Sequence, residues 1–470
     1  MILALSVRGQ VGNPTVTDMN ALSWRDNGPF ELSPERGRYA LTYSLIEDHS
    51  YSFSLPIARF ATPDLGYKDG KYVSLFAPGV SYAIIPGYLV GKYFGSVQVG
   101  SYAVIALFAL LNILLVRSIA LRLGAHPLAA TLGAITFLFA SPAFAYSVSL
   151  FQHQISTFLI LASIYLLLRW NNILSLFIIF SLFALSVPVD NPNLILMLPI
   201  AIAAGIKFFS VKVEKEAYKI SFSLLKALSV LGIVLPLVFF LWFNNASYGN
   251  PLQLAGTVSG VREIDENGKP VAPKNAGKND TALLNDPTRQ QKTATGFFKT
   301  RNILNGFTIQ FFGRDRSIVW FTPVMFLAIP GAFLLYKKKK DMAVVLVGII
   351  GADLLLYSLW GDPWGGWAFG SRYLIPSYAI GGIFISIGLT YLRKYAILPV
   401  LFTILFVYSV SINTLGALTT NRNPPKVEIL GLEALSGREE KYSYDRNFQY
   451  LQESGLKSFV YNTFFIYSFP

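Results

Sequence analysis

The chain has 470 residues, of which 53% are hydrophobic and only 14% are charged, about half of the usual quarter in soluble domains. With a mean hydropathy of +0.47, this composition excludes an ordinary soluble enzyme and indicates a polytopic membrane protein. The chain has no cysteine, which excludes disulfides and thiolate metal sites, and its three histidines lie far apart in sequence. The net charge of +13 fits basic cytoplasmic loops and a basic site for an anionic lipid better than a nucleic-acid partner.

A short apolar stretch, residues 1–8, opens the chain and is too short to span a bilayer, so we interpret it as the remnant of a first transmembrane helix. Later apolar runs are long enough to cross the membrane as helices, in which every backbone group is satisfied internally. The expected fold is therefore an all-α polytopic membrane protein with about 11 transmembrane helices. The later runs fall near 100–118, 127–147, 151–170, 173–189, 192–210, 222–243, 317–336, 342–360, 373–392 and 396–418.

A further apolar block, residues 76–96, contains Pro78, Pro86 and several glycines and is a poor straight span. If this block does not cross, the basic turns of the chain all fall on one side of the membrane, which makes that side cytoplasmic. We therefore predict that the block is a juxtamembrane or re-entrant segment. The basic turns carry Arg117, Arg122, Arg169, Lys207, Lys212, Lys215, Lys219, Lys226, Lys337 to Lys340, Arg393 and Lys394.

This charge pattern divides the chain into outer and membrane segments. Residues 9–99 form a first extracytoplasmic loop that includes the juxtamembrane segment, and transmembrane helices occupy 100–243. A second outer loop, 244–316, has no clear period, and we expect it to be partly disordered. Further transmembrane helices occupy 317–418, and an extracytoplasmic tail follows at 419–470.

The first outer loop concentrates polar residues beside the membrane, where such residues tend to be functional. After Ser33 and Pro34, apolar residues recur at helical spacing and predict an amphipathic juxtamembrane helix along the membrane surface. Glu35 would lie in the first turn of this helix, where a carboxylate is favoured by the helix dipole. From the pattern alone, Glu35 is either a cap of the helix or a functional carboxylate.

The next stretch, TPDLGYKDGKYVSLFAPG, places Asp64, Asp69 and Lys71 among turn residues. The Asp69-Gly70 pair is a turn signal, so one interpretation of this stretch is a plain hairpin. The other interpretation is a loop that presents the acids, Lys71 and Tyr72 next to the membrane.

Two later stretches bring arginine to the outer mouths of predicted spans. In GDPWGGWAFGSRYLIP, residues 361–376, Trp364 and Trp367 fit an aromatic belt, whereas Arg372 needs an anion, for which a lipid phosphate is an obvious source. In FFGRDRSIVWFTP, Arg314 lies at a second outer mouth, and the neighbouring Arg316 pairs either with an anion or with the adjacent Asp315. A lone histidine at the outer start of a helix, His153, is more often structural than catalytic.

Several function classes lack their signatures in this sequence. No G-x-x-x-x-G-K-[ST] and no G-x-S-x-G pattern occurs, which argues against an ATPase and a serine hydrolase. Asp353 is the main acid inside the predicted spans, and a proton- or ion-coupled transporter would need more.

Stretches distributed in order over residues 33–380 resemble the C-type superfamily of integral membrane glycosyltransferases. Within it, the chain is most similar to the prokaryotic branch akin to protein O-mannosyltransferases and lipid A aminoarabinose transferases. The order and topology of the stretches together carry this resemblance. They are ERGRYALTYSLIEDHS, TPDLGYKDGKYVSLFAPGVSYAIIP, FASPAFAYSVSLFQHQ, NNASYGNPLQ, GRDRSIVWFTPV and WGGWAFGSRYLIP.

The resemblance implies transfer of a sugar from a polyprenyl-phosphate donor to a hydroxyl of a protein, lipid or glycan at the extracytoplasmic face of the cell membrane, with inversion at the anomeric carbon. It also implies a general base in the first outer loop, a position on which Glu35 falls, with Asp64 and Asp69 in reserve. Arg36 stands where many relatives have a second acid. Residues that would bind the donor and its phosphate are Arg38, Lys71, Tyr72, Arg314 and Arg372, while His153, Trp364 and Trp367 are acceptor-binding or structural.

Alternative functions stay open at this point. A flippase for lipid-linked saccharides, or a polymerase or ligase of surface polysaccharide, would also combine many helices with a basic outer site. A non-catalytic scaffold would leave the gathering of acids and arginines on one face unexplained. The expected partners are membrane lipids, the lipid-linked sugar and its acceptor, with no nucleic acid. The sequence indicates no cofactor, and it leaves a divalent metal open without supplying a motif for one.

Overall fold

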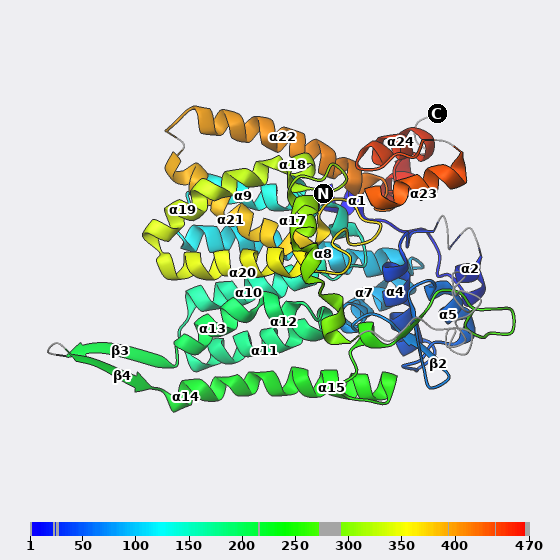
Figure 1. The fold of residues 1–470 in the computed structure, drawn as a ribbon, viewed down its shortest axis with the longest axis horizontal. Helices are drawn as coiled ribbons and strands as arrows, with labels where there is room; N and C mark the ends of the chain where they lie inside the picture. Colours follow the sequence, from blue (N-terminus) through cyan, green and yellow to red (C-terminus); the bar gives the residue numbers. More distant parts are fainter. Residues whose placement is uncertain are drawn as a thin grey trace.

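Helices account for most of the structure, and within the residues described five segments are long and apolar enough to cross a membrane (Figure 1). The computed structural model describes residues 2–21, 24, 28–214, 217–271, 293–392, 394–437 and 439–465. The predicted all-α polytopic class is confirmed. Three of the segments are single helices, α8 (Val97–Arg122), α20 (Lys340–Ser358) and α22 (Ile397–Leu418). The segment Leu224–Tyr248 consists of α14 (Leu224–Ala227), η2 (Leu228–Ile233) and α15 (Val234–Tyr248). The segment Arg372–Leu392 consists of η7 (Arg372–Leu374) and α21 (Ile375–Leu392).

Shorter apolar helices occupy the other predicted spans, and three of those spans are not continuous. The run near 127–147 is divided before Pro142, the run near 192–210 before Pro199, and the run near 317–336 before Pro323. A continuous helix was the wrong expectation there, because proline has no N–H to donate to the preceding turn. The shorter helices are α9 (Pro127–Phe139), α10 (His153–Arg169), α11 (Ile173–Val189), α12 (Asn193–Leu196), α13 (Leu198–Ile206), α18 (Ile318–Phe321), η6 (Pro323–Leu327) and α19 (Ala328–Lys338).

Helix α21 lies in the centre of the bundle and packs against α8, α9, α10, α19 and α20. Small residues allow this close packing, as is usual between membrane helices. A Cβ atom on Gly133 of α9 would lie 2.2 Å from the carbonyl oxygen of Gly382 in α21. One on Gly331 of α19 would lie 1.8 Å from the carbonyl oxygen of Phe384. Side chains at these glycines would therefore push α21 out of its place.

The two outer loops meet in a small antiparallel sheet. Strands β1 (Leu65–Lys68) and β2 (Lys71–Ser74) form the hairpin that the Asp69-Gly70 signal predicts, with φ of +49° and +77° at these two turn residues. A third strand, β5 (Ser259–Val261), comes from the loop 244–316 and pairs with β1. The sequence did not predict this third strand, which ties the second outer loop to the first.

The block at 76–96 forms two short helices, α6 (Gly79–Ala83) and α7 (Ile85–Tyr93). Neither is long enough to cross a bilayer. Helix α7 packs closely on α8, where a Cβ on Gly87 would lie 2.2 Å from the carbonyl oxygen of Gly100. The apolar side chains of Leu89 and Val90 stay exposed on its other side.

Helix α4 (Ser33–Ile46) begins where the sequence predicted a helix, but it is not an amphipathic surface helix. Charged and apolar side chains of its first turns are buried alike, among them Glu35, Arg38 and Tyr39. The expectation was wrong because α5 (Leu55–Ala61), α6 and β2 pack around α4 and cover its polar face as well.

Basic turns gather at the end of the bundle opposite the outer loops, which we call the basic end. Lys339 Nζ donates to the carbonyl of Arg122 at 2.7 Å, and Lys207 Nζ donates to the carbonyl of Leu167 at 2.7 Å. From this end β3 (Phe209–Glu214) and β4 (Ala217–Phe222) project as a hairpin away from the helices (Figure 1). The sequence analysis placed only lysine-bearing turns here and missed both strands, although they alternate between apolar and polar residues. The predicted basic positions Lys215 and Arg393 lie outside the described residues.

Short helices complete the fold around the outer loops and the C-terminal tail. The loop 244–316, expected to be partly disordered, contains η3, β5, η4, η5 and α17 in its described parts, and residues 272–292 lie outside the description. The remaining helices are α1 (Ile2–Ser6), α2 (Val16–Asn20), η1 (Ala145–Val148), η3 (Ala255–Thr257), η4 (Ala294–Phe297), η5 (Thr300–Asn302), α17 (Ile303–Phe311), α23 (Lys426–Ser436), α24 (Asp445–Ser454) and η8 (Tyr461–Phe465).

Candidate functional site

A cavity of about 1210 Å³ lies at the end of the bundle that carries the outer loops. Its wall includes Val189 at the end of α11, Tyr357 in the last turn of α20 and Arg372 just before α21. The cavity is therefore lined by the ends of the spans rather than by their middles. Charged side chains of both signs line it, including Asp64, Asp190, Asp362, Arg38, Arg372 and Arg422.

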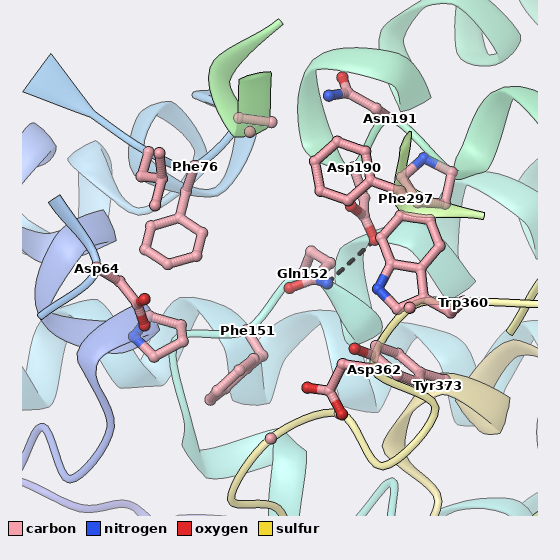
Figure 2. Close-up of a pocket in the computed structure, with 18 of the residues that line it drawn as sticks. Asp64, Phe76, Phe151, Gln152, Asp190, Asn191, Phe297, Trp360, Asp362 and Tyr373 are labelled. Atoms are coloured by element: carbon pink, nitrogen blue, oxygen red, sulfur yellow. Dashed lines mark hydrogen bonds between the residues drawn. The ribbon is translucent and has the colours of Figure 1, made fainter. Parts of the chain in front are cut away.

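Two sides of the cavity differ in chemistry (Figure 2). In this view Asp64 and Phe76 lie on one side, and an aromatic group with Trp360 and Tyr373 lies on the other. The rings of Tyr373 and Tyr357 stack in parallel at 4.1 Å. A polar ligand with an apolar extension would match such a wall.

Arg38 and Arg372 approach the same aromatic ring in the cavity wall. The guanidinium carbon of Arg372 lies 4.6 Å from the centroid of the Phe151 ring, and that of Arg38 lies 5.2 Å from it. Within the described part of the chain, Nε and Nη1 of Arg372 and Nε of Arg38 are buried without a hydrogen-bond partner. Two neighbouring guanidinium groups with unused donors are suited to hold an anion such as phosphate.

The electrostatics of Arg38 fit this description. Burial, helped by the like charge of Arg372 and opposed by Asp190, lowers the pKa of Arg38 to about 10. Each charged guanidinium therefore disfavours the other, and a bound anion would relieve that repulsion.

A chain of side-chain hydrogen bonds links Arg38 to an acid across the cavity wall. Arg38 Nη2 donates to Gln152 Oε1 at 2.6 Å. Gln152 Nε2 in turn donates to Asp190 Oδ2 at 3.0 Å (Figure 2). Asp190 follows α11 directly. Burial raises the pKa of Asp190 to about 6, although the hydrogen bond from Gln152 and the charge of Arg38 oppose the shift.

Of the three carboxylates that the sequence analysis selected as possible bases, only Asp64 lines the cavity. Its Oδ2 accepts a hydrogen bond from Ser33 Oγ at 2.5 Å, which holds the half-buried carboxylate beside the start of α4. Asp64 is also near enough to act on the charge of Arg38. The cavity thus combines a carboxylate with a cationic pair.

Glu35 is fully buried and is not part of the cavity wall. Its Oε2 accepts from the backbone N–H of Leu32 at 3.4 Å, the capping arrangement, and its Oε1 accepts from the N–H of Leu150 at 3.0 Å. Burial, only partly offset by Arg8, raises the pKa of Glu35 to about 7. The contacts match the capping interpretation of Glu35 and add a link between α4 and the segment before α10.

Glu35 belongs to a group that we call the buried carboxylate cluster, made up of Arg8, Glu31, Glu35 and Lys457. Arg8 Nη1 donates to Glu31 Oε2 at 2.9 Å, and Lys457 Nζ donates to Glu31 Oε1. Although burial opposes it, these two cations lower the pKa of Glu31 to about 2. The cluster joins the N-terminal segment to the C-terminal tail.

The hairpin residues predicted to face the donor point elsewhere. Asp69 and Lys71 are exposed at the turn and do not line the cavity. The hydroxyl of Tyr72 donates to the carbonyl of Gly268 at 2.9 Å, which ties the hairpin to the second outer loop. The expected phosphate contacts of Lys71 and Tyr72 therefore find no support, because the hairpin turns these side chains away from the cavity.

The arginines of the second outer mouth also lie outside the cavity wall. Arg314 is exposed and forms a 3.4 Å ion pair with Asp445. Arg316 is buried, pairs with Asp315 at 3.2 Å and donates to the carbonyls of Trp364 and Gly366. The structure thus confirms the local pairing of Arg316 with its neighbouring acid, and it does not place Arg314 with Arg372.

The remaining predicted residues divide between wall and support. Trp367 lines the cavity, and its indole Nε1 donates to Glu428 at 2.6 Å. The backbone carbonyl of Trp364 accepts a hydrogen bond from Arg316. His153 is buried outside the wall, parallel to the Phe151 ring at 5.9 Å between centroids, with Nε2 unpartnered among the described residues. His153 thus supports Phe151 from behind.

Sequence reasoning missed Gln152, Asp190 and Asp362 in the wall. Gln152 belongs to the FQHQ stretch, from which the sequence analysis selected only His153, and Asp190 lies between the predicted spans 173–189 and 192–210. An acid between two predicted spans, at the end assigned to the outer side, is the signal that could have found Asp190. No group of three or more His, Asp or Glu side chains suited to a metal is found in the described residues.

Fold and site together define a polytopic helical membrane protein with a charged cavity at one end of its bundle. Solved structures that match it include two of ArnT from Cupriavidus metallidurans, each 12% identical in sequence to this chain. The match to ArnT in the apo state has a TM-score of 0.43 and covers 88% of this chain and 67% of ArnT. The match to ArnT bound to undecaprenyl phosphate has a TM-score of 0.45 and covers 88% of this chain and 68% of ArnT. Another is the archaeal oligosaccharyltransferase AglB from Archaeoglobus fulgidus, in complex with an inhibitory peptide and a dolichol-phosphate. It is 15% identical in sequence, and the match has a TM-score of 0.43 and covers 89% of this chain and 55% of AglB.

These neighbours belong to the C-type superfamily that the sequence stretches resemble. At 12–15% identity the likeness is one of fold alone. No family model matches the sequence, and no curated protein matches it.

Proposed function

We propose that the protein is a membrane glycosyltransferase that transfers a sugar from a polyprenyl-phosphate donor to an acceptor hydroxyl in the cavity. The observation that carries the proposal is the pair of guanidinium groups of Arg38 and Arg372 at the Phe151 ring, with buried donors that have no partner among the described residues. A phosphate would satisfy these donors, and it is the leaving group of such a donor.

The reaction needs two further parts, and the cavity offers both. As the acceptor oxygen attacks the anomeric carbon, the hydroxyl must lose its proton, and Asp64 is the carboxylate that takes it in this proposal. The bond between the anomeric carbon and the phosphate oxygen breaks, and Arg38 and Arg372 stabilise the negative charge that grows on that oxygen. A single displacement of this kind inverts the anomeric configuration. The wall of Tyr357, Trp360 and Tyr373 supplies apolar surface for the start of the lipid chain.

A flippase is less well supported. Moving a charged headgroup across the bilayer needs polar groups along the middle of the bundle. The cavity wall instead takes its span residues from helix ends, such as Val189 and Tyr357.

The test uses the full chain in lipid nanodiscs with undecaprenyl phosphate and with undecaprenyl-phosphate-linked sugars. Arg372→Ala should bind undecaprenyl phosphate at least about tenfold more weakly, since hydrogen bonds to charged groups contribute roughly 1.5–3 kcal/mol. Sugar release from the labelled donor in the presence of membrane-derived acceptors should depend on Arg372 and Asp64. Unchanged affinity in Arg372→Ala, or wild-type protein that moves the lipid across the bilayer without releasing sugar, would overturn the proposal.

The side of the membrane follows from charge in this proposal. Because positive charge is retained in the cytoplasm, the basic end is cytoplasmic and the cavity is extracytoplasmic. The cysteine-free chain allows a direct check with Glu266→Cys in the second outer loop and Lys337→Cys at the basic end, both exposed. In intact cells an impermeant maleimide should label the variant at 266 and not the one at 337. The reverse pattern would contradict this orientation.

A further inference from the structure

The chain Arg38–Gln152–Asp190 has a fixed hydrogen-bond direction. A carboxylate only accepts and a guanidinium only donates, so the amide of Gln152 must turn its NH₂ group to Asp190 and its oxygen to Arg38. The distances agree, with 3.0 Å from Gln152 Nε2 to Asp190 Oδ2 and 2.6 Å from Arg38 Nη2 to Gln152 Oε1. The opposite orientation would set two donors against each other at Arg38. Asp190 therefore determines what Gln152 presents to the arginine.

The surroundings of Arg38 make this contact important for its position. Its Nη1 donates to the carbonyl of Pro34 at 3.2 Å, and its guanidinium carbon lies 4.8 Å from the Phe76 ring centroid and 5.2 Å from that of Phe151. Gln152 supplies the one side-chain hydrogen bond that the described residues offer this guanidinium. Without it, the charge of the nearby Arg372 would push Arg38 away from the Phe151 ring.

Asp190 is itself held in a defined setting. The groups that act on it or on which it acts are Gln152, Arg38, Arg372, Tyr357 and Tyr373. It is half-buried in the cavity wall, and its main chain is fixed at the end of α11, where its N–H donates to the carbonyl of Ser186 at 3.0 Å. A carboxylate so placed can orient its neighbour without contacting the anion.

We propose that Asp190 is a positioning residue, which acts through Gln152 to hold the Arg38 guanidinium beside Arg372 in the geometry that binds the donor phosphate. The inference rests on the proposed function and identifies a residue that determines the geometry of its phosphate site. It predicts a change in anion affinity opposite to the one expected from charge alone. Removing a negative charge near an anion site should by Coulomb's law alone strengthen anion binding. If Asp190 positions Arg38, removing it weakens binding instead.

The first test measures binding of undecaprenyl phosphate to the full chain in nanodiscs. Asp190→Ala should weaken binding about 3- to 100-fold, the range expected for coupling inside one hydrogen-bond network. Asp362→Asn is the matched control, because it removes another cavity carboxylate, one that forms no hydrogen bond with Gln152 in the described part of the chain. Equal or tighter binding is expected in this variant. Equal or tighter binding in Asp190→Ala as well would overturn the inference.

The second test reverses the direction of the chain. Gln152→Glu sets two carboxylates against each other and should weaken binding. Adding Asp190→Asn to it restores a complementary chain, so binding should recover. In this double variant the amide introduced at position 190 donates to the carboxylate introduced at position 152, and that carboxylate accepts from Arg38. This pair also carries the test if Asp190→Ala does not fold. Failure of the double variant to recover, with both proteins folded, would contradict the positioning role.

Two reference measurements separate this inference from the proposed function. In the double variant, turnover should recover together with affinity. A recovered affinity with lost turnover would keep the positioning role and transfer the role of proton acceptor from Asp64 to Asp190, which would overturn that part of the proposed function. Arg38→Ala and Arg372→Ala should both weaken binding. If neither does, the phosphate site itself is wrong, whereas weak binding in both beside normal binding in Asp190→Ala refutes only the inference.

Discussion

The buried carboxylate cluster and the cavity wall share Glu31 and contain the same kinds of charged side chain, yet their chemistry differs. In the cluster, Glu31 has both oxygens engaged by Arg8 and Lys457, and Glu35 accepts two backbone N–H groups. In the wall, guanidinium donors of Arg38 and Arg372 have no partner among the described residues, and Asp64 lines the cavity beside them. A charged group whose contacts are complete stabilises the fold, and one whose contacts are incomplete is available to a ligand.

The comparison also shows why a motif position does not determine a role. Glu35 and Asp64 lie near the same end of α4, and Ser33 bonds to Asp64 from the turn that Glu35 caps. The segment around Leu150 packs over Glu35 and keeps it out of the cavity wall, whereas Asp64 lines the cavity. The following predictions test this division.

The largest expected effect is the loss of a cluster contact. Arg8→Ala should destabilise the protein by about 3–5 kcal/mol, because the buried carboxylate of Glu31 loses one of its two cationic partners. The thermal unfolding midpoint in detergent would measure this. Lys441→Ala, which removes the exposed pair with Glu439, is the control and should change stability by less than about 1 kcal/mol. Equal stability of Arg8→Ala and Lys441→Ala would contradict the structural role of the cluster.

The next effect concerns catalysis. Asp64→Asn should reduce turnover about 10²- to 10⁴-fold, the usual contribution of general acid–base catalysis, while donor binding survives. Glu35→Gln and Asp69→Asn are the comparisons, since the first carboxylate is buried outside the wall and the second is exposed on the hairpin. A dead Glu35→Gln enzyme that still folds and binds donor, beside an active Asp64→Asn enzyme, would return the role of base to Glu35.

A smaller effect is the pH dependence of stability. Burial raises the pKa of Glu35 from 4.5 to about 7, so between these values the folded state holds a proton that the unfolded state has released. The contribution of Glu35 to stability is therefore full below pH 4.5 and is lost as the pH rises through about 7. Unfolding midpoints of wild type and Glu35→Gln across this window would measure it. The decline should be shallower in the variant, and identical slopes would show that Glu35 does not titrate there.

The smallest effect should come from Arg314→Ala. Its exposed ion pair with Asp445 contributes little to stability, and Arg314 does not line the cavity. Affinity for undecaprenyl phosphate should therefore stay within about twofold of wild type, in contrast to the loss expected in Arg372→Ala. A loss of affinity in Arg314→Ala similar to that in Arg372→Ala would extend the phosphate site to this mouth.

Particular residues show how far the sequence could be read. The start of α4 after Ser33, the turn at Asp69 and Gly70 and the helical runs followed from local signals. The breaks at Pro199 and Pro323 were also local, but long apolar runs concealed them. Asp190 carried a local signal as an acid between two predicted spans, but nothing along the chain shows that Asp190 and Gln152 meet Arg38.

The sequence by itself determined that the protein is helical and belongs in a membrane, because apolar runs of sufficient length leave no other way to satisfy the backbone. It also determined which turns are basic, and it identified Arg372 as a cation in need of an anion. Only the tertiary structure decided which charges are used up within the fold. Glu31 meets Arg8 and Lys457, and Arg38 and Arg372 meet each other at Phe151. Such outcomes depend on segments distant along the chain, and burial then multiplies the effect of each contact by removing water.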